Sequence, residues 1–357
     1  MFRTLILGLF FALLHVTWTA PAAMAQEGLW GKFSAAGRQA LEKRDFPAAE
    51  KQFAAALKEA ERHGPETARV ATTLFSQAEL LGAQGKYAAA EPLVRRVLTI
   101  RKKVLPPDHP DLALSRAAMG SVHLRKHKFA EAEPFATRAL ATLEKVVAAD
   151  DPRLAAALNV VGMLYTMQRR LAEAEPFAIR AFTIRQDALA ADHLDVAESA
   201  NNLGFLYLLQ KDFDAAEKFL AHGLAIRQKA LQADHPDIAQ SLNNLGALYT
   251  VQGRHADAVR YIEAALVIRE KVFGPEHESV GQGHYNLGVL YQFQNRLDKA
   301  EAHYRKAMEI RQNALGPMHP LVADTLENYA VLLMMTGRMG DAARLGQRAR
   351  EIRAQSK

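Results

Sequence analysis

Histidine, the commonest metal ligand in proteins, recurs in this chain at one position of a regular spacing. The residues are His109, His193, His235, His277 and His319, separated by 42 residues or twice that number. Zinc needs its nitrogen ligands within about 2.1 Å, whereas equivalent positions of stacked helices lie about 8–10 Å apart. We therefore predict that these histidines are structural and that the chain holds no metal and no cofactor; only a chance cluster would change this.

No catalytic motif accompanies the histidines. His277-Glu278 lacks the second histidine of a zinc-protease helix, and the chain contains neither a Gly-x-Ser-x-Gly turn nor a phosphate-binding loop. The sequence predicts no catalytic residue and therefore a protein without enzymatic activity.

Arginines recur at a second repeat position, at the ends of predicted helices, where Leu143 is the exception. The members of this arginine column are Arg101, Arg185, Arg227, Arg269, Arg311 and Arg353. They either form a ladder of anion sites or complement the helix dipole and pair with an aspartate of the following connection. The second interpretation is favoured because a cation is common in a last helical turn.

The elements that carry these columns are paired helices in a 42-residue repeat. Leu242, Leu245, Gly246 and Tyr249 fall on one face of a helix, and a second apolar helical pattern follows the turn at residues 252–254. Each unit begins with a segment such as Asp234-His235-Pro236-Asp237, in which we expect the first aspartate to cap the helix.

Two columns of small residues predict close contact between the paired helices. One column contains Gly120, Gly162, Gly204, Gly246 and Gly288; the other contains Ala90, Ala132, Ala174, Ala216, Ala258, Ala300 and Ala342. Glycine inside a helix costs roughly 0.5–1 kcal/mol relative to alanine, so a conserved register of five glycines indicates close approach of two backbones.

The repeats extend over residues 26–357 as one all-α domain of about eight helix-turn-helix units. We expect the units to begin near Trp30, Ala71, Ala113, Ala155, Ala197, Ala239, Gly281 and Ala323. The last helix is rich in arginine and glutamate, which suits the end of a stack.

Residues 1–25 are predicted to form a secretory signal peptide. Arg3 precedes an apolar stretch from Leu5 to Leu14, and Ala23-Met24-Ala25 forms a small-x-small cleavage site. A membrane anchor is the alternative, although the stretch is shorter than the roughly 20 residues of a span. We expect a bacterial periplasmic or secreted protein without a transmembrane segment after cleavage.

The repeat resembles the tetratricopeptide repeat, in its longer form typical of kinesin light chains and many bacterial proteins. The resemblance rests on the Leu, Leu-Gly, Tyr pattern, the Asn-Asn-Leu-Gly run, Ala-Glu-Pro-Phe and Asp-His-Pro-Asp, and it covers Trp30 to the C-terminus. It implies a right-handed superhelical solenoid whose first helices line a concave groove, and it implies no enzymatic activity.

The resemblance also implies ligand-binding asparagines in the groove, which hold the backbone of a bound peptide. The matching positions are Asn202, Asn244, Asn286 and Asn328, with Asn159, Asn201 and Asn243 one residue earlier in their repeats. An amide side chain can donate and accept, as a peptide backbone requires. Alternatively, these residues bond the neighbouring first helix and hold the stack together.

An apolar stripe surrounds the asparagines on the same helix face. It comprises Met163, Met167, Phe205, Leu208, Leu209, Val251, Val289, Phe293, Met334 and Met335. Part of it is expected to be core, and any exposed part favours an apolar ligand segment. Acidic Glu198, Asp324 and Glu327 on this face disfavour the acidic cargo of kinesin light chains.

These observations predict a non-enzymatic scaffold for a peptide or protein partner. The alternative is an accessory or regulatory subunit of a cell-envelope enzyme complex that uses a basic outer face. The formal net charge of +6 is modest for 357 residues, so no nucleic-acid partner is expected.

Overall fold

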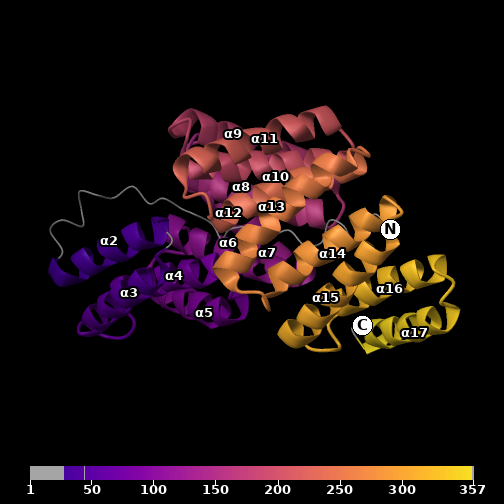
Figure 1. Ribbon diagram of the computed structural model, residues 1–357. Helices are drawn as coiled ribbons and strands as arrows, with labels where there is room; N and C mark the ends of the chain where they lie inside the picture. The colour runs from indigo at the N-terminus through magenta and orange to yellow at the C-terminus, as the bar shows by residue number, and fades with distance from the viewer. Residues whose placement is uncertain (1–27, 44, 356–357) are drawn as a thin grey trace. The chain divides into compact units, whose positions relative to one another are not determined.

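Sixteen α-helices, joined by short turns, make up the described residues 28–43 and 45–355 of the computed structural model (Figure 1). The first helices of the eight repeats are α2 (Gly28–Glu42), α4 (Ala68–Ala83), α6 (Pro110–Arg125), α8 (Pro152–Met167), α10 (Leu194–Gln210), α12 (Pro236–Val251), α14 (Glu278–Phe293) and α16 (Pro320–Met335). The second helices are α3 (Phe46–Glu61), α5 (Tyr87–Val104), α7 (Phe129–Val146), α9 (Leu171–Ala188), α11 (Phe213–Ala230), α13 (His255–Phe273), α15 (Leu297–Leu315) and α17 (Met339–Gln355). The predicted all-α array of about eight helix pairs is confirmed, and each first helix begins slightly before the expected start of its repeat.

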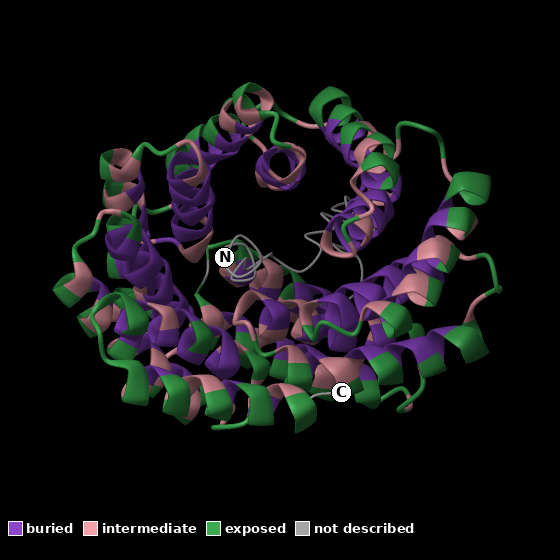
Figure 2. Cartoon of the chain, turned by 90° about the vertical axis from the view of Figure 1, so that its right-hand side faces the viewer, coloured by how far each residue is buried: buried purple, intermediate pink, exposed green. Residues whose placement is uncertain are grey.

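The described residues fall into two compact units, here called the N-terminal unit (residues 28–210, α2 to α10) and the C-terminal unit (residues 211–355, α11 to α17). Within each unit every helix packs on the next one in sequence, and first helices also pack on each other, as α6 does on α8 and α14 on α16. The first helices from α4 to α16 are therefore mostly buried, while the second helices alternate buried and exposed positions (Figure 2).

Histidines cap five of the eight first helices, whereas Asp151 caps α8 and Thr67 caps α4. The Nδ1 atoms of His109, His193, His235, His277 and His319 accept a hydrogen bond from the backbone N–H two residues later, at 3.1–3.2 Å. The prediction that Asp108 or Asp234 caps the helix is wrong, because the helix begins one residue later and the proline or glutamate after the histidine is its first residue. The histidine column is thus structural, as predicted.

Glycine brings the two helices of a repeat into contact. A Cβ added at Gly120 would lie 3.2 Å from the backbone nitrogen of Ala136, and one at Gly246 would lie 2.5 Å from Ile262. The alanines opposite, such as Ala132 and Ala258, are fully buried. The predicted close approach is confirmed in these repeats.

The turn inside the second to eighth repeats imposes a left-handed backbone conformation at one column. Its residues are Gly85, His127, Arg169, Lys211, Gly253, Asn295 and Gly337, with φ between 56° and 77°. Glycine adopts this conformation without strain, but the four other residues carry a Cβ that opposes it. The turns with His127, Arg169, Lys211 or Asn295 therefore adopt the same geometry as the turns with glycine, although these residues do not favour it locally.

The members of the arginine column are buried except Arg353, which pairs with Asp324 and Glu327 within the last repeat. The guanidinium of Arg185 donates to the backbone oxygen of Asp195 at 3.0 Å and to the Ser199 hydroxyl at 2.9 Å. Arg101 makes the same two bonds, to Asp111 and Ser115, each at 2.8 Å. Both guanidinium groups are buried. Arg101 and Arg185 also lie 3.8 and 4.0 Å from the carboxylates of Asp111 and Asp195. They therefore fasten a second helix to the following first helix and pair with its aspartate, as the favoured interpretation predicts, and they do not form an exposed anion ladder.

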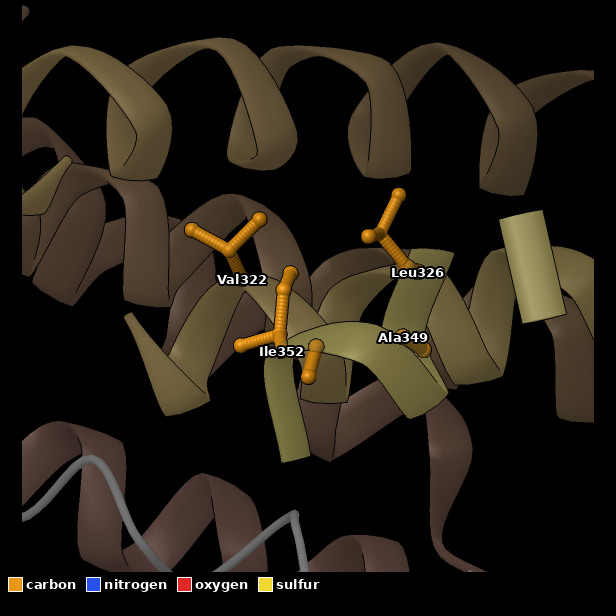
Figure 3. Close-up of a cluster of buried hydrophobic side chains, with 5 residues drawn as sticks. Val322, Leu326, Ala349 and Ile352 are labelled. Carbon is orange, nitrogen blue, oxygen red and sulfur yellow. The ribbon is translucent and has the colours of Figure 1, made fainter. Parts of the chain in front are cut away.

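Each described end of the array has its own small apolar cluster. At the start, the indole of Trp30 is buried and donates to the Thr73 hydroxyl at 2.9 Å. At the other end, Val322, Ala323 and Leu326 of α16 pack against Ala349 and Ile352 of α17 (Figure 3). The opposite side of α17 is polar, as predicted for a terminal helix.

The predicted signal peptide, residues 1–25, lies outside the described residues. None of the helices among residues 28–43 and 45–355 is both long enough and apolar enough to span a membrane.

Candidate functional site

The predicted groove asparagines lie in the middle of the first helices and are buried. Asn159 belongs to α8, Asn201 and Asn202 to α10, Asn243 and Asn244 to α12, Asn286 to α14 and Asn328 to α16. The first three lie in the N-terminal unit and the other four in the C-terminal unit. The structure therefore gathers the set in two groups.

Several of these asparagines hydrogen-bond to a neighbouring first helix. The Asn286 amide donates to the Oδ1 of Asn243 at 2.9 Å, and the Asn328 amide donates to the Tyr285 hydroxyl at 2.8 Å. In the N-terminal unit, the Asn159 amide donates to the Ser199 hydroxyl at 2.9 Å. For these three residues the bonds match the alternative in which asparagines hold the stack, and binding of a ligand backbone by the set stays a prediction.

The acidic residues predicted on the groove face form ion pairs with arginines of the fold. Glu198 accepts a hydrogen bond from Arg185 at 2.9 Å. Asp324 is buried and pairs with Arg353, which also reaches Glu327 at 3.2 Å. Since their charges are matched by the arginine column, these carboxylates carry less repulsion toward an acidic ligand than the sequence suggested.

A polar hollow that the sequence did not reveal lies in the N-terminal unit. Its lining residues come from α2, α4, α5 and α6 and are Arg38, Thr72, Phe75, Ser76, Glu79, Arg101, Asp111 and Leu114. Burial raises the pKa of Glu79 to about 8, although the positive charges of Arg38 and Arg101 oppose the rise. Glu79 belongs to no motif of the repeat, so only the packing of four helices brings these charges together.

The apolar stripe divides into a buried part and an exposed part. Met163, Phe205, Leu208 and Val289 are buried core residues. In contrast, Phe293, Met334 and Met335 of the C-terminal unit are 45%, 46% and 50% exposed. The C-terminal ends of α14 and α16 thus present large apolar side chains to solvent.

Polar and aromatic neighbours surround these exposed side chains, here called the Phe293–Met335 surface (Phe293, Met334 and Met335). The ring of His255, at the start of α13, stacks nearly parallel on Phe293 with centroids 6.2 Å apart. The Gln292 amide lies 3.4 Å from the sulfur of Met335, and its oxygen accepts from the Tyr304 hydroxyl at 2.7 Å. Three consecutive repeats of the unit therefore contribute to one surface of apolar side chains with hydrogen-bonding groups beside it.

Among the residues that the structure describes, no group of three histidine, aspartate or glutamate side chains is placed to hold a metal ion. His284 and His303 form a close histidine pair, whose Nδ1 atoms lie 3.0 Å apart between α14 and α15. Burial and the neighbouring His303 lower the pKa of His284 to about 4. At neutral pH the pair is uncharged, with one ring donating to the other.

Comparison with protein families gives repeated matches along the chain. The family described as tetratricopeptide repeat matches residues 34–103, 77–145, 153–229, 237–313 and 281–355. No curated protein has a sequence that matches significantly.

Solved structures with the same kind of fold share little sequence with this chain. A Rap protein solved in complex with Competence and Sporulation Factor is 14% identical, covers 92% of this chain and 99% of its own, and has a TM-score of 0.64. Aspartyl phosphate phosphatase F from Bacillus subtilis is 15% identical, with 92% and 94% covered and a TM-score of 0.52. A Podosopora anserina protein described as a kinesin light chain with nearly identical TPR-like repeats is 22% identical, with 58% and 98% covered and a TM-score of 0.49. At these identities the first two similarities show the fold alone.

Proposed function

The chain belongs to the tetratricopeptide repeat family, and from this premise we propose that it is a non-enzymatic scaffold that binds a peptide or protein partner. An apolar segment of that partner contacts the Phe293–Met335 surface of the C-terminal unit. The motifs of the family consist of packing residues, so we expect the function to depend on side chains that stay exposed after the helices pack.

The observation that carries this proposal is the exposure of Phe293, Met334 and Met335 at the ends of two adjacent first helices. Equivalent positions earlier in the unit do not share it: Val251, one repeat before Phe293, is half-buried, and Thr250, two repeats before Met334, is buried. Grouped large apolar side chains on a surface mark interaction sites more often than isolated ones. Methionine adapts its shape to different partners, which suits a scaffold.

The buried asparagines fit this proposal as the frame beneath the binding surface. Asn286 links α14 to α12, and Asn328 links α16 to α14, so they fix the spacing of the helices that carry the exposed side chains. Replacement of Asn286 by alanine should lower the melting temperature, because the Oδ1 of Asn243 loses its donor at an expected cost of about 1–3 kcal/mol. If the asparagine contacts the partner instead, binding should fall while the melting temperature stays unchanged.

The Rap protein that shares the fold was solved with Competence and Sporulation Factor bound. This supports a binding role for a stack of such helix pairs. It says nothing of which partner this chain selects, because the similarity is one of fold.

Site-specific photocrosslinking tests the proposal. A benzoylphenylalanine at position 334 should crosslink to a partner, whereas the same group at Val267 should not, because Val267 lies on the second helix α13 with 64% of its surface exposed. The partner identified in this way is then titrated against the purified protein. Replacement of Met334 and Met335 by glutamine should weaken binding by at least about tenfold, or about 1.4 kcal/mol, as expected for loss of a central apolar contact.

The matched control replaces Val267 by glutamine and should bind like the wild type. Equal crosslinking at positions 334 and 267, or wild-type affinity of the double methionine variant, would remove the Phe293–Met335 surface from the proposal. Both variants alter exposed residues, so their folding should remain intact.

We also propose that the protein is exported and that Ala25 is the last residue removed. The support is the order of a short basic segment, an apolar stretch and Ala23-Met24-Ala25. Intact-mass measurement of protein from the native host should show Gln26 as the first residue. A retained Met1 in the membrane fraction would contradict this and indicate an anchor.

A further inference from the structure

A hollow on the N-terminal unit gathers three cations that no carboxylate neutralises. It lies between α5, α6 and α7 and is lined by Leu98, Lys102, Arg116, Pro134, Phe135 and Arg138. Among residues 28–43 and 45–355, no acidic side chain lies within ion-pair distance of Lys102, Arg116 or Arg138. Exposed cations without partners are common, so Lys102 and Arg138 alone would not indicate a site.

Arg116 is different because its side chain is buried. The residue is only 5% exposed, and its guanidinium reaches the backbone oxygen of Pro107 at 3.4 and 3.5 Å, the long limit of a hydrogen bond. Burial and the nearby positive charge of Arg138 both lower the pKa of Arg116. A buried charge normally has a partner of opposite sign, since its loss of hydration is otherwise costly.

The next repeat shows what the same positions look like without a site. One repeat of 42 residues later, Pro176, Phe177 and Arg180 correspond to Pro134, Phe135 and Arg138. There, however, a leucine stands in place of Arg116 and a glutamate in place of Lys102. Leu158 is fully buried, and Glu144 pairs with Arg180 at 2.6 Å. The geometry of the repeat thus brings the positions of Lys102 and Arg138 within contact distance.

We propose that Lys102, Arg116 and Arg138 bind the dianionic phosphoryl group of a small phosphate or phosphate monoester. Two guanidinium groups match the oxygens of a tetrahedral phosphoryl group, and an ammonium adds a mobile point charge. A dianion balances three cations better than a single carboxylate does. The site lies on α5, α6 and α7 and is independent of the Phe293–Met335 surface.

The apolar side of the hollow distinguishes the two sources of the phosphoryl group. Leu98 is buried, and Phe135 is half-buried with its ring stacked on His123 at a centroid distance of 5.7 Å. A monoester with a flat organic group can cover these side chains, whereas inorganic phosphate cannot. Phenyl phosphate should therefore bind more tightly than inorganic phosphate if the natural ligand is an ester, and equally if it is the free ion.

Isothermal titration calorimetry of the full chain with inorganic phosphate and with phenyl phosphate tests the site, at one ionic strength held constant with chloride. Saturable binding with one equivalent is expected. Lys102→Glu recreates the pairing of Glu144 with Arg180 and should weaken binding at least about tenfold, by loss of one cation and gain of one anion. Arg116→Leu recreates Leu158 and should weaken binding to the same degree.

The matched control is Arg180→Gln, which removes an arginine at the equivalent position of the next repeat and should leave both affinities within about twofold. Lys102→Glu changes an exposed residue, so the test stands even if Arg116→Leu were to fold poorly. Absence of saturable binding of both probes, or equal weakening by Arg180→Gln and Lys102→Glu, would overturn the proposal.

Discussion

Two successive interfaces of the N-terminal unit are built on the same positions of the repeat but differ in charge. Between α7 and α9, Leu158 fills the centre and Glu144 pairs with Arg180. Between α5 and α7, Arg116 fills the centre, and the outer pair becomes Lys102 and Arg138. The small-residue columns and the buried Ala132 and Ala174 are common to both. The two interfaces thus share the same backbone packing but differ in the balance of positive and negative charges.

The difference shows which positions the fold leaves free. Ala and Gly columns cannot change because two backbones meet there, with only 3.2 Å from a Cβ at Gly120 to the Ala136 nitrogen. The positions of Arg116 and Lys102 face the boundary between second helices, where a hollow tolerates other side chains. Binding chemistry can therefore vary from repeat to repeat without loss of the array.

The C-terminal unit contains a third version of this interface. His284 and His303 occupy the repeat positions of Arg116 and Phe135, and Lys306 occupies that of Arg138. Here a half-buried pair of titratable histidines occupies the centre, with Glu270 3.8 Å from the Nε2 of His284. Glu263 faces His303, and Lys299 and Lys306 add positive charge around the pair.

The largest effect is expected when the hollow lined by Lys102, Arg116 and Arg138, here called the basic hollow, is copied into the next repeat. The double variant Glu144→Lys, Leu158→Arg should lower the free energy of unfolding by about 3–5 kcal/mol, because it buries a guanidinium without a partner and breaks the pair with Arg180. Thermal melts with and without phosphate give the measurement, and phosphate should restore part of the loss. An unchanged melting temperature would mean that this interface tolerates charge without a ligand.

The interface that contains His284 and His303 predicts that the stability of the protein depends on pH, with a somewhat smaller effect. The unfolded pKa of 6.5 falls to about 4 in the folded protein for His284. Between these values the unfolded chain binds a proton that the folded one does not, so this stability is fully present above pH 6.5 and is lost as the pH falls toward 4. The lowered pKa corresponds to a loss of about 3 kcal/mol at most.

The measurement for this prediction is the difference in melting temperature between the wild type and His284→Leu from pH 4 to pH 7. The difference cancels contributions from other groups, such as Glu79, whose raised pKa acts in the opposite direction. The wild type should lose stability relative to the variant as the pH is lowered. If the difference in melting temperature does not change with pH, protonation of His284 does not affect stability in this range.

The reverse exchange in the basic hollow should be stabilising. Arg116→Leu replaces the buried guanidinium by the residue of the next repeat and should raise the free energy of unfolding by about 2 kcal/mol in phosphate-free buffer. Chemical denaturation checks the gain, and Arg138→Leu should give a smaller gain, because Arg138 is exposed but its positive charge opposes that of Arg116. A loss of stability would show that the bonds of Arg116 to Pro107 already compensate its charge.

The smallest effect concerns the turns that lead into α5 and α9. Gly85 precedes α5 at φ 74°, whereas Arg169 precedes α9 at φ 64° with a Cβ that opposes this conformation. Arg169→Gly should therefore stabilise the protein by about 1 kcal/mol. Amide hydrogen exchange of α8 and α9 should slow accordingly, and Gly85→Ala should show the opposite effect. Faster exchange in the glycine variant would mean that the Arg169 side chain contributes more than its backbone costs.

The sequence alone determined the array of helix pairs. The 42-residue interval, the helical spacing around Leu242 and Tyr249, and the glycine and alanine columns predict it, because contact between helix backbones permits few residue types at each position. The same reasoning placed the histidines at helix starts for the right structural reason, although it assigned the cap to the aspartate one residue too early.

Tertiary structure decided which polar residues remain available for binding. The sequence could not separate asparagines that bond a neighbouring helix, such as Asn286, from groove residues, because an amide serves both purposes. Nor could it show that Arg185 is buried or that Arg116 lacks a carboxylate, since the partners lie on other helices. Local periodicity specifies which face of a helix is buried, but the balance of charges at that face depends on side chains brought together only when the repeats stack.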